Sequence, residues 1–228
     1  MVDSWLILET SGRVARVGLA RGESIVRAEA LDDTRRHARD LAATVEQLLK
    51  AESLKPTDLT GVIVSRGPGS YTGLRVGLMS AKALAYATDC KLIAVETFAA
   101  IAVQAPSEAR SLWVMADALQ NQIYIQRFTK SVDGAWDPEH ELRIERVEDA
   151  LKEAVPGTWM TGSGVKVYSG LIPPGCPCVN EVDREPRVES LFKVGFALAP
   201  VTREQLFALE PLYLRGSSAE EKAKAEGK

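Results

Sequence analysis

Residues 66–77 read Arg-Gly-Pro-Gly-Ser-Tyr-Thr-Gly-Leu-Arg-Val-Gly, a glycine-rich stretch between an apolar run and a predicted helix. The short apolar run at 61–65 before it is typical of a buried strand, and a helix is expected over 72–87. A strand, a glycine-rich loop and a helix N-terminus in this order present backbone N–H groups to an anion. The stretch has neither the Gly-Lys-Ser/Thr ending of a P-loop nor the G-x-G-x-x-G spacing of dinucleotide-binding proteins. Two interpretations therefore stay open, a tight strand-to-helix turn and an anion site.

The loop contains residues that suit either interpretation. Gly67 and Gly69 can adopt positive φ, and Ser70 or Thr72 can cap the helix that follows. The candidate loop residues are Gly67, Pro68, Gly69, Ser70, Thr72 and Gly73.

The helix expected over 72–87 is unusual because it is apolar nearly all round. Between Leu74 and Ala87 its only charged residues are Arg75 and Lys82, and many of its other side chains are small. Such a helix must be buried on both sides. One side would pack on the sheet. The other would meet either the helix expected over 35–50 or a second protein, and both remain open.

Hydropathy patterns divide the chain into two subdomains. Three strand-like segments with tight turns precede residue 31, and the helix at 35–50 has an apolar stripe at positions 38, 41, 42, 45, 48 and 49. Residues 1–105 read β-β-β-α-β-α-β-α, which predicts a mixed sheet covered by helices. Pro106 and Ser107 mark a boundary. Residues 106–216 are expected to form a smaller α/β subdomain with a hairpin turn at 117–121, and residues 217–228 a flexible tail.

The composition excludes several classes of function. The chain has 228 residues, a net charge of -3, two histidines and three cysteines. A protein that binds nucleic acid by bulk electrostatics would be basic. His37 and His140 lie too far apart in sequence for a local metal motif, so no metal site is expected. Cys90 and the closely spaced Cys176 and Cys178 match no redox or zinc motif and are interpreted as structural or incidental. No apolar run approaches the ~20 residues of a membrane span and no leader precedes the first strand, so we expect a cytoplasmic protein.

The stretch at 66–77 resembles the signature of the TsaB (YeaZ-like) family, a branch of the actin-like, sugar-kinase-like ATPase superfamily. Four further segments are similar to family segments in the same order along the chain. They are Leu6-Ile7-Leu8-Glu9-Thr10-Ser11, Leu92-Ile93-Ala94-Val95-Glu96-Thr97, Asp117-Ala118 with Ile123-Tyr124, and Glu210-Pro211-Leu212-Tyr213-Leu214-Arg215. The resemblance is strong through residue 104 and looser from about 130 to 205, and the family pattern does not align around 173–177.

The resemblance implies an α/β, two-subdomain actin-like ATPase (sugar-kinase-like) fold with mixed sheets flanked by helices. It also implies a non-catalytic role in forming threonylcarbamoyladenosine next to the anticodon of tRNAs that read codons beginning with adenine. The chain would dock on a TsaD-like transferase together with a TsaE-like ATPase, and would meet tRNA only through this complex. It would have no cofactor of its own, with ATP or ADP bound at the complex interface or on the partners. We expect the free chain to self-associate as a homodimer through its apolar helix.

Carried over onto this sequence, the docking surface lies on the helices at about 35–50 and 72–87. Its candidate residues are His37, Leu41, Val45, Leu48, Leu74, Arg75, Gly77, Leu78, Ala81 and Lys82. The superfamily's first phosphate turn corresponds to Glu9, Thr10, Ser11 and Gly12. Many relatives in the superfamily place an aspartate where Glu9 stands, and no Gly-Gly or Gly-Thr pair follows it. The turn is therefore interpreted as vestigial.

The main alternative is an independent sugar-kinase-like phosphotransferase. Such an enzyme needs two phosphate-cradling hairpins, but only residues 10–12 resemble the first, and 117–120 lack the glycines of the second. A metallopeptidase would need a paired histidine motif. A self-standing RNA-binding protein would need a basic surface and a larger aromatic content than 6%. These comparisons favour the accessory subunit.

Overall fold

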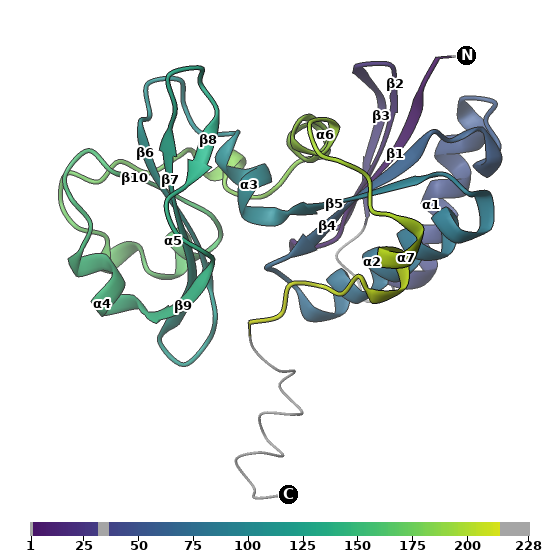
Figure 1. Cartoon of the computed structure of the whole chain (residues 1–228). Helices are drawn as coiled ribbons and strands as arrows, with labels where there is room; N and C mark the ends of the chain where they lie inside the picture. Colours follow the sequence, from purple (N-terminus) through teal and green to yellow (C-terminus); the bar gives the residue numbers. More distant parts are fainter. Residues whose placement is uncertain (1, 32–36, 215–228) are drawn as a thin grey trace, which may run out of the picture.

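The first lobe is built on a five-stranded sheet with the order β3-β2-β1-β4-β5 (Figure 1). This computed structural model describes residues 2–31 and 37–214, with no side-chain description for 37–39, so the tail predicted at 217–228 lies outside it. The strands are β1 (Ser4–Glu9), β2 (Arg16–Arg21), β3 (Ser24–Ala30), β4 (Gly61–Gly67) and β5 (Lys91–Glu96). The first three pair antiparallel, and β1, β4 and β5 pair parallel. The predicted meander and mixed sheet are confirmed.

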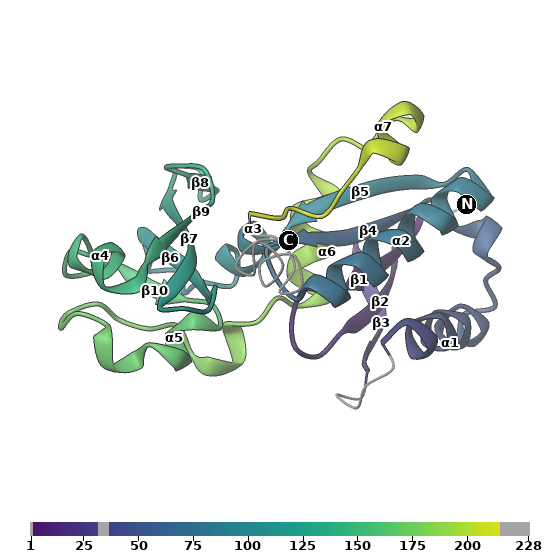
Figure 2. The same cartoon turned by 90° about the horizontal axis from the view of Figure 1, so that it is seen from below.

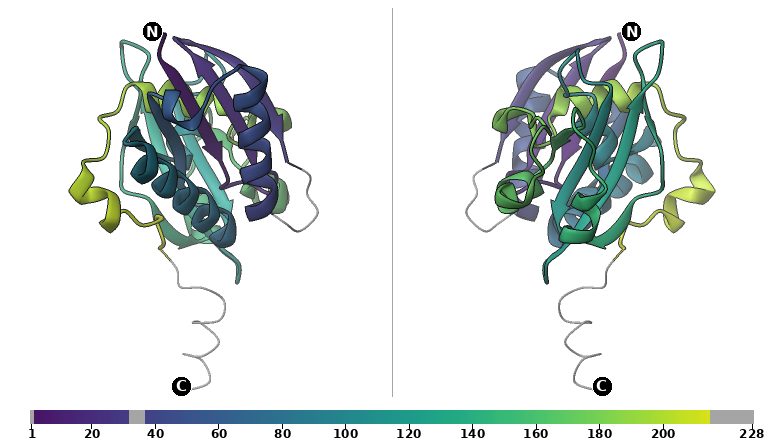
Figure 3. Two further views of the ribbon diagram at one scale, coloured as in Figure 1. Left: turned by 90° about the vertical axis from the view of Figure 1, so that its right-hand side faces the viewer. Right: turned by 90° about the vertical axis from the view of Figure 1, so that its left-hand side faces the viewer.

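Helices cover both faces of this sheet (Figures 2 and 3). One face carries α1 (His37–Ala51) and α2 (Tyr71–Thr88), and the other carries α3 (Thr97–Ala102) and α6 (Val188–Phe196). Side chains along β1 alternate between the two faces of the sheet. Leu6 and Leu8 pack toward α1 and α2, whereas Trp5 and Ile7 pack toward α6. A 3-10 helix at Pro56–Asp58 lies between α1 and β4.

The second lobe is a five-stranded sheet with the order β10-β6-β7-β8, and β9 also pairs with β7. Its strands are β6 (Ser111–Asp117), β7 (Gln122–Lys130), β8 (Trp136–Pro138), β9 (Arg143–Arg146) and β10 (Trp159–Thr161). Its helices are α4 (Val147–Lys152) and α5 (Gly164–Val167), with 3-10 turns at Ser169–Leu171 and Glu181–Asp183. The predicted hairpin between β6 and β7 is confirmed, whereas β8 and β9 are too short and too weakly alternating to be predicted from the sequence.

The chain returns to the first lobe earlier than the predicted boundary of 106–216. The α6 helix buries Val188, Leu191 and Phe192 against the first sheet. Beyond it, α7 (Arg203–Ala208) packs Leu206 on the same face as α1 and α2. Residues 188–214 are therefore part of the first lobe (Figure 1). The apolar stripe of α6 would look the same whichever sheet it covered, so the sequence could not place it.

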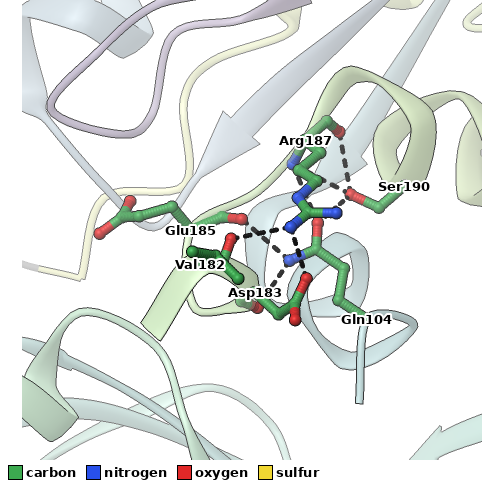
Figure 4. Close-up of polar contacts among 6 residues, drawn as sticks. All are labelled: Gln104, Val182, Asp183, Glu185, Arg187 and Ser190. Atoms are coloured by element: carbon green, nitrogen blue, oxygen red, sulfur yellow. Dashed lines mark hydrogen bonds and ion pairs between the residues drawn. The ribbon is translucent and has the colours of Figure 1, made fainter. Parts of the chain in front are cut away.

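Gln104 ties together the two segments that connect the lobes (Figure 4). Its Nε2 donates to the carbonyl oxygens of Asp183 and Glu185 at 2.7 and 2.9 Å. Its Oε1 accepts from the Arg187 backbone N–H at 3.0 Å and the Ser190 hydroxyl at 2.7 Å. One side chain thus fixes the entry to α6 relative to the end of α3.

Candidate functional site

The glycine-rich loop joins β4 to α2 and begins the helix as predicted. Ser70 is the cap, since its Oγ accepts from the Gly73 N–H at 3.2 Å, and Thr72 lies within the helix. Gly67 adopts φ +113°, and the Gly67–Pro68 peptide is cis. Gly69 does not have a positive φ, so backbone conformation does not explain why residue 69 is a glycine.

The glycines at 69, 73 and 77 pack closely against the turn that follows β1. The Ser70 N–H donates to the Ser11 carbonyl at 2.8 Å. A Cβ on Gly69 would overlap the Ser11 backbone, and one on Gly73 would overlap the Thr10 carbonyl. A Cβ on Gly77, four residues further along α2, would overlap Thr10 Oγ1. The glycines therefore allow α2 to lie directly on the β1–β2 turn, which supports the tight-turn interpretation.

In the β1–β2 turn, Glu9 accepts hydrogen bonds from the backbone amides that a bound anion would need. Its Oε1 accepts from the Ser11 N–H and Oγ, both at 2.6 Å, and from the Gly12 N–H at 3.1 Å. Burial raises the pKa of Glu9, although the hydrogen bonds from Ser11 and Gly12 act in the opposite direction. Among the described residues, its Oε2 has no hydrogen-bond partner.

A second carboxylate lies beside the same turn. Glu185 Oε2 would stand 3.1 Å from a Cβ built on Gly12. Burial raises the pKa of Glu185, and Arg16 opposes this shift. The free space between this turn and α2 is about 10 Å³, too small for a phosphate group. The turn predicted at Glu9, Thr10, Ser11 and Gly12 is present, but its own carboxylate fills the anion position.

Most of the predicted docking residues lie inside the lobe, which corrects the expectation that they form a surface. The buried ones are Leu41, Leu48, Leu74, Gly77, Leu78 and Ala81. Val45, Arg75 and Lys82 retain exposed surface. The side chain of His37 lies outside the described part of the chain. The physical reason is that α2 is apolar nearly all round, so its composition does not indicate which side meets the sheet.

The exposed side of α2 consists of residues that the sequence analysis does not select. Met79 is 61% exposed and Tyr86 is 59% exposed, and both follow Arg75 at helical spacing. Phe207 of α7, 66% exposed, meets Tyr86 edge to face at a centroid distance of 5.7 Å. Large apolar side chains at this exposure form a patch of the kind that marks interaction surfaces.

A groove of about 750 Å³ runs between α1 and α2 beside this patch. Its floor and walls are mainly apolar, and Glu46, Lys50 and Lys55 stand among the lining residues. The lining residues of α2 are Ser80, Ala83, Leu84 and Ala87, and those of α1 include Leu41, Ala42, Val45 and Leu49. Small residues at positions 80, 83 and 87 share one side of α2. This spacing is the sequence signal that could have identified the groove.

The C-terminal segment packs along the opposite side of α2. The Leu212 N–H donates to the Arg66 carbonyl at 2.7 Å, and Tyr213 stacks on Tyr71 with ring centroids 4.7 Å apart. Lys82 Nζ donates to the carbonyls of Phe207 and Leu209, both at 3.0 Å. Lys82, a candidate residue of the predicted docking surface, therefore holds the end of α7 in place.

The rare residues carry no local metal chemistry in the described part of the chain. Cys90, Cys176 and Cys178 are free thiols. Burial raises the pKa of Cys90 and of Cys176, which lowers their reactivity. Within residues 2–31 and 37–214, no three His, Cys, Asp or Glu side chains gather as a metal site, and no helix is long and apolar enough to cross a membrane.

Comparison with known proteins identifies the family. The TsaD family profile, described as tRNA N6-adenosine threonylcarbamoyltransferase, matches residues 31–160. The Escherichia coli tRNA threonylcarbamoyladenosine biosynthesis protein TsaB is 28% identical over 60% of this chain and 62% of its own length. Its Bacillus subtilis counterpart is 29% identical over 52% of each chain. The match thus spans between half and two thirds of these two relatives. An uncharacterised Mycobacterium tuberculosis protein is 26% identical over 96% of this chain and 94% of its own length.

The solved structure of YeaZ from Pseudomonas aeruginosa has the same fold, with a TM-score of 0.75, 24% identity, and coverage of 93% of this chain and 100% of that one. The two-lobe α/β architecture is that of the actin-like ATPases. The chain belongs to the TsaD family, in its TsaB (YeaZ-like) branch.

Proposed function

We propose that this chain is an accessory subunit in the biosynthesis of threonylcarbamoyladenosine on tRNA, and that it acts by docking on a TsaD-like transferase. The observation that carries the proposal is the apolar groove between α1 and α2 with the exposed Met79 and Tyr86 beside it. A groove of this shape and lining suits an amphipathic helix of a partner. The names of the E. coli and B. subtilis relatives indicate the pathway.

A non-catalytic role is supported by the turn at residues 9–12, where the Glu9 side chain already accepts hydrogen bonds from the backbone amides. Glu9 takes the Ser11 and Gly12 amides, so a nucleotide phosphate would have to displace a buried side chain. ATP or ADP would then bind at the complex interface or on the partners, which include a TsaE-like ATPase. The tRNA would be contacted through the complex, in the cytoplasm.

Size-exclusion chromatography of the purified chain with a TsaD-like transferase tests docking. The expected result is co-elution at micromolar concentration, and separate elution would contradict the proposal. A separate sample of the purified chain without the transferase should transfer no threonylcarbamoyl group to tRNA. Activity without the transferase would contradict the accessory role even if the two proteins co-elute.

A further inference from the structure

The groove between α1 and α2 has a direction, because the two helices that form it run parallel. The α1 helix joins β3 to β4 and α2 joins β4 to β5, and the pairing of the sheet makes these three strands parallel. Both helices therefore return across the sheet in the same direction and end at the same edge of it. Lys50, in the last turn of α1, and Ala87, in the last turn of α2, both line the groove. Two helix C-termini thus form one end of the groove.

The groove carries one unpaired positive charge, and this charge lies at that end. The charged residues among its described lining are Glu46, Lys50 and Lys55. Glu46 and Lys50 compensate each other in an ion pair of 2.5 Å. Lys55 is exposed between the end of α1 and the start of β4, and no described carboxylate forms an ion pair with its ammonium group. Asp58 accepts a hydrogen bond from the backbone N–H of Lys55 instead.

The C-terminus of α2 sets a second condition at the same end. A helix C-terminus carries a partial negative charge, which basic residues in the last turn usually compensate. The last turn of α2 has no basic residue, and Asp89, which caps it, is acidic and pairs with Arg203. The N-terminal turn of another helix, with its partial positive charge, would compensate this end of α2.

The walls of the groove indicate which side chains such a helix presents. Ala42 of α1 and Ser80, Ala83 and Ala87 of α2 are small lining residues, and the remaining described lining is mainly aliphatic. Small residues on the walls leave room for large apolar side chains of an incoming helix. A stripe of large apolar residues at spacings of three and four along one side of that helix would fill the groove.

We infer that the groove receives an amphipathic helix of the transferase that runs antiparallel to α1 and α2 and carries an acidic residue in its first turn, opposite Lys55. This inference rests on the proposed docking function. Acidic residues in a first turn also stabilise their own helix, so one arrangement satisfies Lys55, the C-terminus of α2 and the incoming helix. A helix in the parallel direction would bring its own C-terminal carbonyls against the C-terminus of α2.

Zero-length cross-linking of the full chain to a TsaD-like transferase tests the direction of the helix. A water-soluble carbodiimide joins a lysine amine to a carboxylate that contacts it, and peptide mass spectrometry identifies both residues. The expected product links Lys55 to an Asp or Glu in the first turn of a transferase helix. A link from Lys55 to the last turn of a helix, or a complex that forms without any link at Lys55, would overturn the inference.

Titration calorimetry with the same transferase tests the charge. At low ionic strength Lys55→Glu should bind about tenfold more weakly than wild type, and added salt should reduce this difference. Lys91→Glu is the matched control, because Lys91 is an exposed lysine of the first lobe outside the groove. Equal affinity of all three proteins would overturn this inference and leave docking itself intact. Absence of binding by wild type would contradict the proposed function and this inference with it.

Discussion

Gly77 of α2 lies so close to Thr10 that a single methyl group on residue 77 would overlap the Thr10 hydroxyl oxygen. This contact fixes α2 on the turn after β1 and thereby sets which side of the helix faces outward. The glycines at 69, 73 and 77 consequently allow the loop and α2 to approach the turn after β1 closely. The side of α2 that carries Met79 and Tyr86 is exposed as a result.

Gly77→Ala should destabilise the fold rather than act on docking alone. Overpacking a tight site costs about 1–3 kcal/mol, which outweighs the gain in helix propensity of about 1 kcal/mol. Urea unfolding at neutral pH measures the loss. Gly170→Ala is the control, because a Cβ there meets nothing within 4 Å. Equal stability of both variants and wild type would mean that the Thr10 contact relaxes without cost.

Glu9→Gln should change the pH dependence of stability. Because burial raises the pKa of Glu9 above its ordinary value of 4.5, the folded state binds a proton more tightly than the unfolded state. The contribution of Glu9 is therefore fully present below pH 4.5 and is lost as the pH rises toward its folded pKa. The carboxamide of the variant does not titrate, so the free energy of unfolding of the variant relative to wild type should increase as the pH rises above 4.5. Urea unfolding across that range checks the slope, and a difference that is constant with pH would contradict it.

Lys82→Met should loosen α7 without unfolding the lobe. The substitution removes both hydrogen bonds to the Phe207 and Leu209 carbonyls and keeps an unbranched side chain of similar length. Hydrogen exchange should become faster in Arg203–Ala208 and stay unchanged in β1. Lys50→Met removes a surface ion pair with Glu46 and serves as the control. Unchanged exchange in α7 would show that the packing of Leu206 and Phe207 holds that helix without Lys82.

Gln104→Leu should weaken the connection between the lobes. It removes four hydrogen bonds to the segment that leads into α6, and we expect a loss of about 1–3 kcal/mol because several partners are partly buried. Urea unfolding measures the loss, and small-angle scattering detects a change in the mean separation of the lobes. Gln47→Leu, on the exposed side of α1, is the control. If both variants match wild type, the packing of α3 against the second sheet holds the lobes together without Gln104.

The first lobe can be predicted from the sequence because its elements have strong periodic signals. The apolar stripe of α1 is typical of a helix, and the apolar run of β4 is typical of a buried strand. Ser70 and Thr72 are both predicted as helix caps, and the hydrogen bond from the Gly73 N–H shows that Ser70 is the cap. The α2 helix shows where this reasoning stops. Its outward side depends on the contact between Gly77 and Thr10, which lie far apart in the chain, so sequence reasoning selects the buried Leu74 and Leu78 in place of Met79 and Tyr86.

The remaining features depend on packing that has no local pattern. Residues 188–196 form an amphipathic helix that either sheet could accommodate, and only the structure assigns it to the first lobe. Gln126 resembles any polar residue in an alternating strand until the structure shows it buried at the junction of the lobes. The role of Glu9 also requires the structure, because the direction of its carboxylate depends on how the turn after β1 folds.

Docking through the α1–α2 groove can be tested by measuring the affinity of the chain for a TsaD-like transferase. Ala83 is exposed and lines the groove, so Ala83→Glu places a charge on its apolar wall without disturbing the core. Val182→Glu, at a site 72% exposed in the second lobe, is the matched control. Titration calorimetry should show wild type and Val182→Glu binding equally and Ala83→Glu binding at least tenfold more weakly, a loss of about 1.4 kcal/mol. Equal affinity of all three proteins would contradict docking through this groove.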